Sequence, residues 1–359
     1  MVWIPFHSVD ALMMKIASVT LASNRESLIG DALRSVAGWV DLACIIDLGI
    51  TDGTLDVARE IMGDRVRVRK ASDVLTTGQL RNIGNDFAFE CGADRDVTLD
   101  TDERINVGNF DIRKHLSSMG FDCIVTQDAG RTYSKERFFR LPAVTRWSGH
   151  CHERTEGGTF GFLQQVTFTE IPKSPEAMAT KLAFIVSEAT RILADHPEDS
   201  RYWFHLGDAL QLQGKHEEAV EAFRSCHRFS QDPSESAWAC FCIAKSLDKL
   251  GKLWEAVDAC AVGLASHPGM AELAWYAGYL NLKLGKPEPA IMWSRMAVAN
   301  GLADGYGKKV LRLFYQFPPG LYEAPYETIA LAEEALGNKY AAETAARLAA
   351  RARKMREAA

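Results

Sequence analysis

The sequence lacks several features that mark large classes of proteins. It has no run of 18 apolar residues, which excludes an ordinary transmembrane helix. Basic residues are not in excess, because 41 Lys and Arg stand against 47 Asp and Glu, and the net charge of −6 disfavours a basic nucleic-acid-binding protein. No basic segment precedes the first apolar residues, so we expect no cleaved signal peptide.

None of the 8 cysteines forms a Cys-x-x-Cys pair, the spacing common to zinc and redox motifs. Most of them lie in apolar periodic segments, where a free cysteine behaves as a small hydrophobic residue. We therefore expect buried thiols, a reducing environment and a cytoplasmic location. The run His150-Cys151-His152 lacks the fourth ligand and the spacing of a structural zinc site.

The residues that are present indicate a globular protein of two domains. The chain has 359 residues, which is long for one domain, and 47% of them are hydrophobic. Strand-like and helix-like segments alternate before Pro172, whereas helices alone are expected after it. We predict an α/β domain over residues 1–172 and an all-α domain over residues 173–359.

In the first domain, short apolar runs alternate with amphipathic segments. We expect strands at residues 15–22, 42–47, 66–68 and 96–99, and helices at residues 27–36, 53–62 and 79–91. This alternation predicts a mostly parallel sheet with helices on both faces. Ligands bind such sheets beyond the carboxyl ends of the strands, which makes residues 23–26, 47–54 and 100–103 the candidate loops.

The second domain contains an internal repeat. Three segments align without gaps: LGDALQLQGKHEEAVEAF (206–223), IAKSLDKLGKLWEAVDAC (243–260) and AGYLNLKLGKPEPAIMWS (277–294). Their small residues Gly207, Ala244 and Gly278 are 37 and 34 residues apart. This period predicts tetratricopeptide helix pairs over about residues 200–302, with degenerate closing helices at 323–357. Such solenoids have a concave surface, which suits a peptide, a protein partner or self-association.

The strongest local signal for chemistry is Leu99-Asp100-Thr101-Asp102-Glu103, which follows an expected buried strand. Residues two apart on an extended chain point the same way, so Asp100 and Asp102 can face one divalent cation. Carboxylate oxygens suit Mg²⁺ or Mn²⁺, and such an ion can bridge a diphosphate. The structural alternative is an acidic turn that caps a following helix.

A basic stretch lies between this segment and the end of the first domain. Its members are Arg131, Lys135, Arg137, Arg140 and Arg146, with only Glu136 opposing them. Two interpretations stay open: a surface that binds phosphates or an acidic acceptor, and a solvated strand face.

Five motifs in a fixed order give the first 170 or so residues a specific resemblance. The motifs are Asn24-Arg25-Glu26 after the first strand, Asp47 to Thr54 after the second, Arg81-Asn82 early in a helix, Leu99 to Glu103, and Gly149 to Glu153. In these motifs the domain resembles family-2 glycosyltransferases of the GT-A fold. Together with its helical repeats, the chain is similar to the peptide S-glycosyltransferase-like branch. Leu48 and Ile50 depart from the family pattern, which has hydroxyl residues at these two positions.

The resemblance implies an inverting, metal-dependent hexosyltransferase-type enzyme. It would move a sugar from a nucleotide-diphosphate donor, with a UDP-sugar favoured, to a peptide or protein acceptor held by the repeats. Two other functions stay open. One is a non-catalytic interaction protein with a degenerate sugar-nucleotide domain, and the other is a surface-glycan or lipid-linked-sugar transferase whose repeats serve assembly.

The resemblance also implies roles for individual residues. The donor contacts fall to Asn24, Glu26, Asp47, Arg81, Asp100 and Trp147. Mn²⁺ or Mg²⁺ would be held by Asp100, Asp102 and His152, with Glu103 orienting the two aspartates. The general base would be Glu153, with Glu156 as the alternative.

Several of these residues have a structural interpretation as well. Glu26 can cap the following helix, Asp47 can form a strand-end turn, and Arg81 can be a solvated helix residue. Trp147 suits the core as well as it suits a sugar face. Asp52 is expected to stabilise its own Asp-Gly turn.

Overall fold

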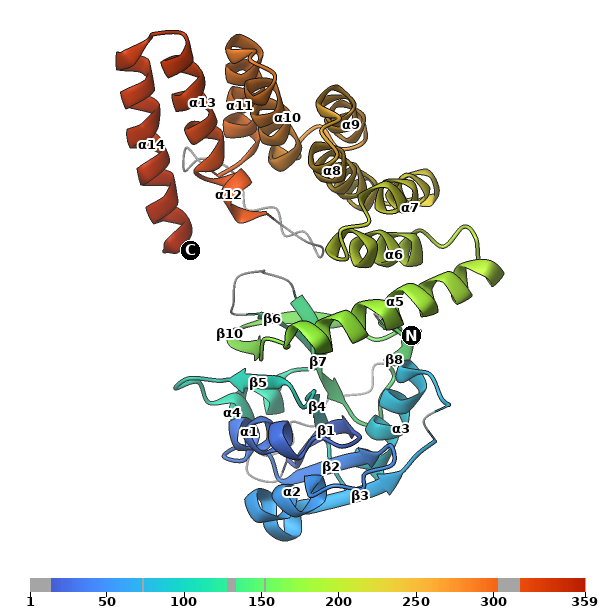
Figure 1. Ribbon diagram of the computed structural model, residues 1–359. Helices are drawn as coiled ribbons and strands as arrows, with labels where there is room; N and C mark the ends of the chain where they lie inside the picture. The colour runs from blue at the N-terminus through green and yellow to red at the C-terminus, as the bar shows by residue number, and fades with distance from the viewer. Residues whose placement is uncertain (1–13, 73, 128–133, 152, 303–316, 359) are drawn as a thin grey trace, which may run out of the picture. The chain divides into compact units, whose positions relative to one another are not determined.

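The computed structural model describes residues 14–72, 74–127, 134–151, 153–302 and 317–358. The predictions for Arg131 and His152 lie outside the described residues. The chain divides into two compact units, Met1–Pro172 and Lys173–Ala359. The first unit carries the sheet and the second consists of helices (Figure 1).

The first unit is built around a sheet of strand order β3-β2-β1-β4-β7-β6-β10-β5. The strands β3, β2, β1 and β4 are parallel neighbours, as are β6 and β10. Strand β7 runs antiparallel to β4 and β6, and β5 runs antiparallel to β10. The prediction of a mostly parallel sheet is therefore confirmed. The strands are β1 (Ile16–Ala22), β2 (Leu42–Asp47), β3 (Val66–Lys70), β4 (Arg95–Thr98), β5 (Glu103–Asn106), β6 (Asp122–Gln127), β7 (Ser134–Arg140) and β10 (Phe160–Glu170), and a separate hairpin pairs β8 (Arg146–Ser148) with β9 (Arg154–Glu156).

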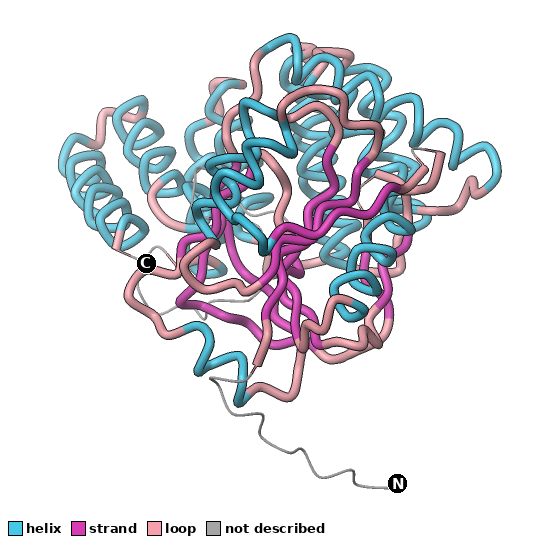
Figure 2. The backbone as a smooth tube through the Cα atoms, turned by 90° about the horizontal axis from the view of Figure 1, so that it is seen from below, coloured by secondary structure: helices cyan, strands magenta, loops and turns pink. Residues whose placement is uncertain are grey.

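Helices cover both faces of this sheet, and Figure 2 shows the strands in magenta and all helices of the chain in cyan. The alternation of side chains along β2 explains why. Ala43 and Ile45 pack with residues of α1, α2 and α4, whereas Cys44 and Ile46 pack with residues of α3. A strand that is buried on both faces needs a continuous apolar run, which β2 has. The helices are α1 (Glu26–Val36), α2 (Thr54–Met62), α3 (Thr77–Glu90) and α4 (Ile112–Ser118).

The second unit consists of a leading helix followed by helix pairs (Figure 1). Each pair is joined by a short turn that contains a glycine with positive φ: Gly214, Gly251, Gly285 and Gly337, at +77°, +74°, +71° and +78°. Glycine adopts this left-handed conformation without the steric cost that other residues meet there. The helices are α5 (Pro175–Asp195), α6 (Ser200–Leu212), α7 (His216–Phe229), α8 (Pro233–Lys249), α9 (Leu253–Ser266), α10 (Ala271–Lys283), α11 (Pro287–Asn300), α12 (Pro318–Leu321), α13 (Ala324–Ala335) and α14 (Lys339–Glu357).

Small residues lie where the two helices of a pair cross. A Cβ atom added to Gly207 would lie 2.8 Å from the Phe223 ring, and one added to Gly278 would lie 2.4 Å from Ser294 Oγ. These contacts give a physical reason for the aligned small residues of the sequence repeat. The cysteines of this unit, Cys226, Cys240, Cys242 and Cys260, are free and buried as expected.

Candidate functional site

The site is centred on Asp100, which follows β4 by two residues at the carboxyl end of the parallel strands. Leu99 donates its N–H to Val19 O of β1 at 2.9 Å, so Asp100 emerges next to the central strand. The order of the strands reverses between β1 and β4, which is the usual location of ligand sites in open α/β sheets. The Asp100 side chain keeps 28% of its surface exposed.

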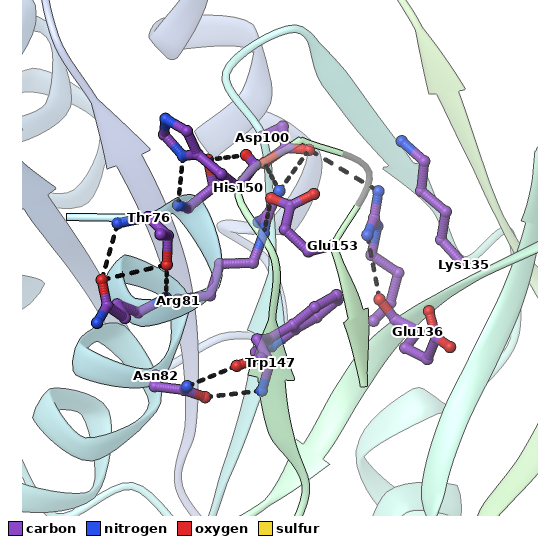
Figure 3. Close-up of polar contacts among 12 residues, drawn as sticks. Thr76, Arg81, Asn82, Asp100, Lys135, Glu136, Trp147, His150 and Glu153 are labelled. Atoms are coloured by element: carbon purple, nitrogen blue, oxygen red, sulfur yellow. Dashed lines mark hydrogen bonds and ion pairs between the residues drawn. The ribbon is translucent and has the colours of Figure 1, made fainter. Parts of the chain in front are cut away.

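Arg81 of α3 connects Asp100 to Glu153 (Figure 3). Its Nη2 lies 3.1 Å from Asp100 Oδ1, and its Nε donates to Glu153 Oε1 at 3.0 Å. The guanidinium also lies over the Trp147 ring, with Cζ 5.2 Å from the ring centroid. The three residues that face Arg81 thus come from the end of β4, from β8 and from the loop after β8, and one cation holds them together.

The segment from Trp147 to His150 is bound along the first turns of α3. Asn82 Nδ2 donates to Trp147 O, and Trp147 N donates to Asn82 Oδ1, both at 2.9 Å (Figure 3). Gly78 N donates to Gly149 O at 2.9 Å. Thr77 Oγ1 donates to His150 O at 2.6 Å, and Thr77 N donates to His150 Nδ1 at 3.1 Å.

The local sequence explains why α3 can accept this segment. Thr76 and Gln79 form a capping box, which starts the helix two residues before the predicted Gln79. Gly78 then has no side chain, and a Cβ atom there would lie 2.9 Å from Gly149 O. The close approach of the two backbones brings Arg81, one turn further on, within reach of Glu153.

A second set of ion pairs lies behind Asp100. Arg137 of β7 pairs with Glu103, and the two side chains are 2% and 1% exposed. Lys135 Nζ lies 3.1 Å from Glu103 Oε1 and 2.7 Å from Glu170 Oε1. Arg137 also approaches Asp100, with Nη2 4.0 Å from Oδ2. Glu103 therefore pairs with both cations of β7, and one of them, Arg137, also lies near Asp100.

These cations determine the ionisation of the two carboxylates. Burial favours the neutral acid, but the charges of Arg81, Arg137 and Lys135 outweigh it and hold the pKa of Asp100 well below its usual value. For Glu153, burial is likewise outweighed by the Arg81 charge, so its pKa is lowered. Both carboxylates are ionised at neutral pH, and Glu153 is a weaker base than a free glutamate.

Three of the residues predicted to contact the donor, Asn24, Glu26 and Asp47, lie at the carboxyl ends of β1 and β2. Asn24 Oδ1 accepts from Thr51 N at 2.8 Å and from Asp52 N at 3.3 Å. Glu26 Oε2 accepts from Gly53 N at 3.2 Å. Asp47 Oδ1 accepts from Gly49 N and Ile50 N at 2.9 and 2.7 Å, the bonds of a strand-end turn.

Asp52 and Glu26 both bond to backbone N–H groups of the segment after β2. Asp52 accepts from Thr54 N at 3.0 Å, so it stabilises its own turn as expected. Glu26 is the first residue of α1, and its side chain bonds the neighbouring loop at Gly53. Arg25, which precedes it, makes no side-chain cap.

Trp147 packs on Phe139 as well as on Arg81, and Glu156 bonds within the hairpin of β8 and β9. Trp147 is 7% exposed and packs edge-on against Phe139 at 5.4 Å, which favours its core interpretation over stacking on a sugar. Glu156 is more than half exposed and accepts from Ser148 Oγ at 2.9 Å and Arg154 Nε at 3.1 Å.

The described members of the basic stretch, at positions 135, 137, 140 and 146, each pair with an acidic side chain. Arg137 is buried in its ion pair with Glu103, Arg140 Nε lies 3.5 Å from the buried Asp122, and Arg146 pairs with Asp86 at 2.8 Å. The alternation along β7 indicates that Lys135 and Arg137, which are two residues apart, point to one face of the sheet. Their acidic partners lie 32 to 35 residues away in the sequence, where no local pattern indicates them.

The structure describes two of the three predicted metal ligands. Asp100 and Asp102 belong to the turn that follows β4, and His152 lies outside the described residues. Within the described part of the chain, no three His, Cys, Asp or Glu side chains form a group that could hold an ion. Two aspartates fit an ion of the Mg²⁺ type, which proteins often bind through one or two carboxylates and the phosphates of a substrate.

Comparison with known proteins identifies a repeat in the second unit. Residues 200–232 match the family model described as tetratricopeptide repeat, so the chain contains this repeat as predicted. The solved structure described as "Crystal structure of MamA" is 15% identical, with a TM-score of 0.40, and the match covers 53% of this chain and 100% of that one. The structure described as "YrrB: a TPR protein with an unusual peptide-binding site" is 10% identical, with a TM-score of 0.37, and the match covers 47% and 77%.

No curated protein matches the chain. Among the described residues, no helix combines the length and the apolar character that crossing a bilayer requires.

Proposed function

We propose that this chain is an inverting, metal-dependent glycosyltransferase that moves a sugar from a nucleotide-diphosphate donor to a peptide or protein. One observation carries the proposal: Arg81, Asp100 and Glu153 meet beyond the carboxyl ends of the central strands, from three separate segments. The family resemblance supports it, and so does the clustering of Asn24, Glu26 and Asp47 in the neighbouring loops.

The charge of the site supports a divalent cation. The joined ion pairs contain three cations and four carboxylates: Arg81, Lys135 and Arg137 against Asp100, Glu103, Glu153 and Glu170. A diphosphate would add further negative charge to this group. Mn²⁺ or Mg²⁺ held by Asp100 and Asp102, with His152 as the proposed third ligand, would offset that charge and stabilise the departing nucleoside diphosphate.

The chain's own residues would bind and orient the reactants. Arg81 suits a phosphate because its planar fork matches two oxygens, and Trp147 supports the guanidinium from one side. Glu26 and Asp47 would accept hydrogen bonds from the nucleoside. Glu153, or Glu156 in its place, would take the acceptor's proton as the acceptor attacks the anomeric carbon and the nucleoside diphosphate leaves.

A turnover assay tests this proposal. Nucleoside diphosphate released from UDP-, GDP- and dTDP-sugars would be measured with Mn²⁺, with Mg²⁺ and with a chelator. We expect metal-dependent release from one donor class, and its loss in Asp102→Asn. The matched control is Asp31→Asn, a 63% exposed aspartate paired with Arg34, which should keep full activity. Full activity of Asp102→Asn would contradict the metal assignment.

The same assay separates the two candidate bases. Glu153→Gln should reduce transfer to an acceptor more than it reduces donor binding, because the proposed base acts on the acceptor. Glu156→Gln should leave transfer unchanged, since Glu156 is exposed and bonded to Ser148 and Arg154. The reverse pattern would move the base to Glu156.

A second candidate function is an interaction protein in which the repeats bind a partner and the sheet domain is a degenerate sugar-nucleotide domain. The bonds of Asn24, Glu26 and Asp47 to backbone N–H groups of residues 49–53 favour it, because these oxygens already have partners inside the chain. Donor binding without any release or transfer, across metals and acceptors, would support this candidate against the transferase.

A further inference from the structure

The connection between α11 and α13 differs from the other connections between helix pairs. Residues 230–232 join α7 to α8, and residues 267–270 join α9 to α10. Residues 301–323 join α11 to α13, and this longer connection includes the short helix α12. Its described end, Phe317 to Leu321, packs against α10 rather than away from the repeats.

Phe317 is bound to α10 through both its ring and its backbone. The ring stacks on Trp275 with centroids 5.1 Å apart and planes 9° apart. The Phe317 N–H donates to Glu272 Oε1 at 3.4 Å, and Glu272 is fully buried. Glu272 and Trp275 are three residues apart on one helix, so they lie on the same face. This face of α10 therefore holds Phe317 at two points, its ring and its backbone N–H, and the ring contact selects an aromatic residue.

Gly320 forms a second point of contact three residues after Phe317. A Cβ atom added there would lie 3.0 Å from Trp275 Cε3 and 3.1 Å from Glu272 Cγ. The φ of Gly320 is not positive, so the requirement for glycine at this position comes from the close approach and not from backbone strain. The pattern that fits the face is an aromatic residue followed by glycine three residues later.

The aromatic surface continues beyond the ring of Phe317. Tyr276 lies 5.4 Å from Phe241 of α8 and 5.6 Å from Tyr279, and Phe317 itself lies 6.3 Å from Phe241. Phe241, Glu272 and Tyr276 are buried, whereas Trp275, Tyr279 and Phe317 are partly buried, so this surface reaches solvent at Trp275 and Tyr279. We call the surface of Phe241, Glu272, Trp275, Tyr276 and Tyr279 the aromatic face.

We propose that the aromatic face is a peptide-binding site for segments with an aromatic residue and a glycine three residues later, and that Phe317 to Gly320 occupy it in the free protein. The chain's own segment is an internal competitor, which a partner peptide must displace. Where the bound peptide is the acceptor of the proposed transferase, the inference rests on that function. Peptide binding itself does not depend on it.

The peptide N-acetyl-Phe-Pro-Pro-Gly-Leu-Tyr-Glu, a copy of residues 317–323, is the probe. Its binding would be measured by titration calorimetry on the full chain without nucleotide. The variant Phe317→Ala/Gly320→Ala removes the ring stack on Trp275 and adds a Cβ atom at the close approach of residue 320, while Leu321 and Tyr322 stay buried. We expect it to bind the peptide about tenfold more tightly than the wild type, the effect of one stacked aromatic pair and its contacts.

Variants of the aromatic face test whether the peptide binds there. Adding Trp275→Leu to the double variant should weaken the peptide about tenfold, because leucine keeps an apolar side chain but cannot stack. The matched control is Trp254→Leu, since Trp254 of α9 is 53% exposed and contacts Lys286. A peptide with alanine in place of its glycine should bind less well, whatever the variant. Circular dichroism and thermal unfolding of each variant show that the helices are intact.

Three results would overturn the inference: equal affinity of wild type and double variant, no binding to the folded double variant at millimolar peptide, or binding that survives Trp275→Leu. The peptide-binding test and the test of the proposed function can fail independently. Peptide binding with no donor binding would leave the aromatic face in place and reject the transferase. Donor turnover with no peptide binding would do the opposite.

Discussion

In the two units of this protein, the residues that contact one another are separated by different distances along the sequence. In the sheet unit, Arg81 bonds Glu153 across 72 positions and Asp100 across 19. In the helical unit, the contacts that repeat along the chain join neighbouring helices, such as Gly207 with Phe223 and Gly278 with Ser294. A site built from distant segments depends on the whole sheet, whereas a helix pair depends mainly on its neighbours.

This difference determines how a local change should spread. A buried ion pair in the sheet unit joins strands that are far apart in the sequence, so its loss should weaken several strands together. A strained helix crossing should disturb its own pair and the pairs beside it. Variants of matched chemistry in the two units therefore test this difference.

The largest effect is expected at Glu103, whose buried carboxylate pairs with Arg137 and Lys135. Glu103→Gln leaves the Arg137 charge without its partner in the core, which should lower the free energy of unfolding by about 3–5 kcal/mol. Hydrogen exchange measured by mass spectrometry should increase in β5, β7 and β10 but not in α8 to α11. An increase confined to residue 103 and its sequence neighbours would contradict the comparison.

The control for this variant is Glu90→Gln in the same unit. Glu90 pairs with Arg69 at the surface, where the two side chains are 54% and 34% exposed. Water and salt screen such a pair, so its loss should cost at most about 1 kcal/mol. Urea unfolding of both variants gives the two free energies under one set of conditions.

An intermediate effect is expected at a helix crossing of the repeats. In Gly278→Ala the new Cβ atom would lie 2.4 Å from Ser294 Oγ and 2.9 Å from Ala290 O, so α10 and α11 must move apart. Overpacking of this kind should cost about 1–3 kcal/mol. Gly269→Ala is the control, because the nearest atom to its new Cβ, on His267, is 3.6 Å away. Equal stability of the two variants in urea unfolding would show that the crossing is not tight.

The smallest effect is expected in the chemical reactivity of the cysteine thiols of the two units. Burial raises the pKa of Cys123 to about 11 and that of Cys240 to about 12, so neither forms the reactive thiolate at neutral pH. Cys91 is partly exposed, whereas the other seven cysteines are buried. Ellman's reagent should therefore react quickly with one thiol of the native protein, and with none in Cys91→Ser. Rapid reaction of several thiols in the variant would mean that the repeats open readily.

The elements with a local signal were predictable from the sequence. The apolar run of β2 has the predicted bounds, 42–47, and the turn glycines of the repeats lie where the alignment places them. Strand β3 extends two residues beyond the prediction to Lys70, because it is a partly exposed strand without a clear apolar run. The repeats were predictable because each helix pair carries its own pattern of small residues and turns.

The ionic contacts of the candidate site were less predictable. Asp100 and Arg81 were expected at the site from the resemblance, but their direct ion pair was not, nor was the burial of Arg137 against Glu103. Partners that are tens of residues apart leave no periodicity in the sequence. The same holds for Phe317 and Trp275, which stack although they are 42 positions apart.

The most direct test of the account is titration calorimetry of nucleoside diphosphates with the wild type and with Asp100→Asn. UDP, GDP and dTDP would each be titrated with Mn²⁺ and with a chelator. We predict metal-dependent binding of one nucleotide class to the wild type, weakened by about tenfold to a hundredfold in Asp100→Asn, which removes the charge of the proposed ligand. No binding of any of these nucleotides to the folded wild type, with or without metal, would contradict the proposed donor site.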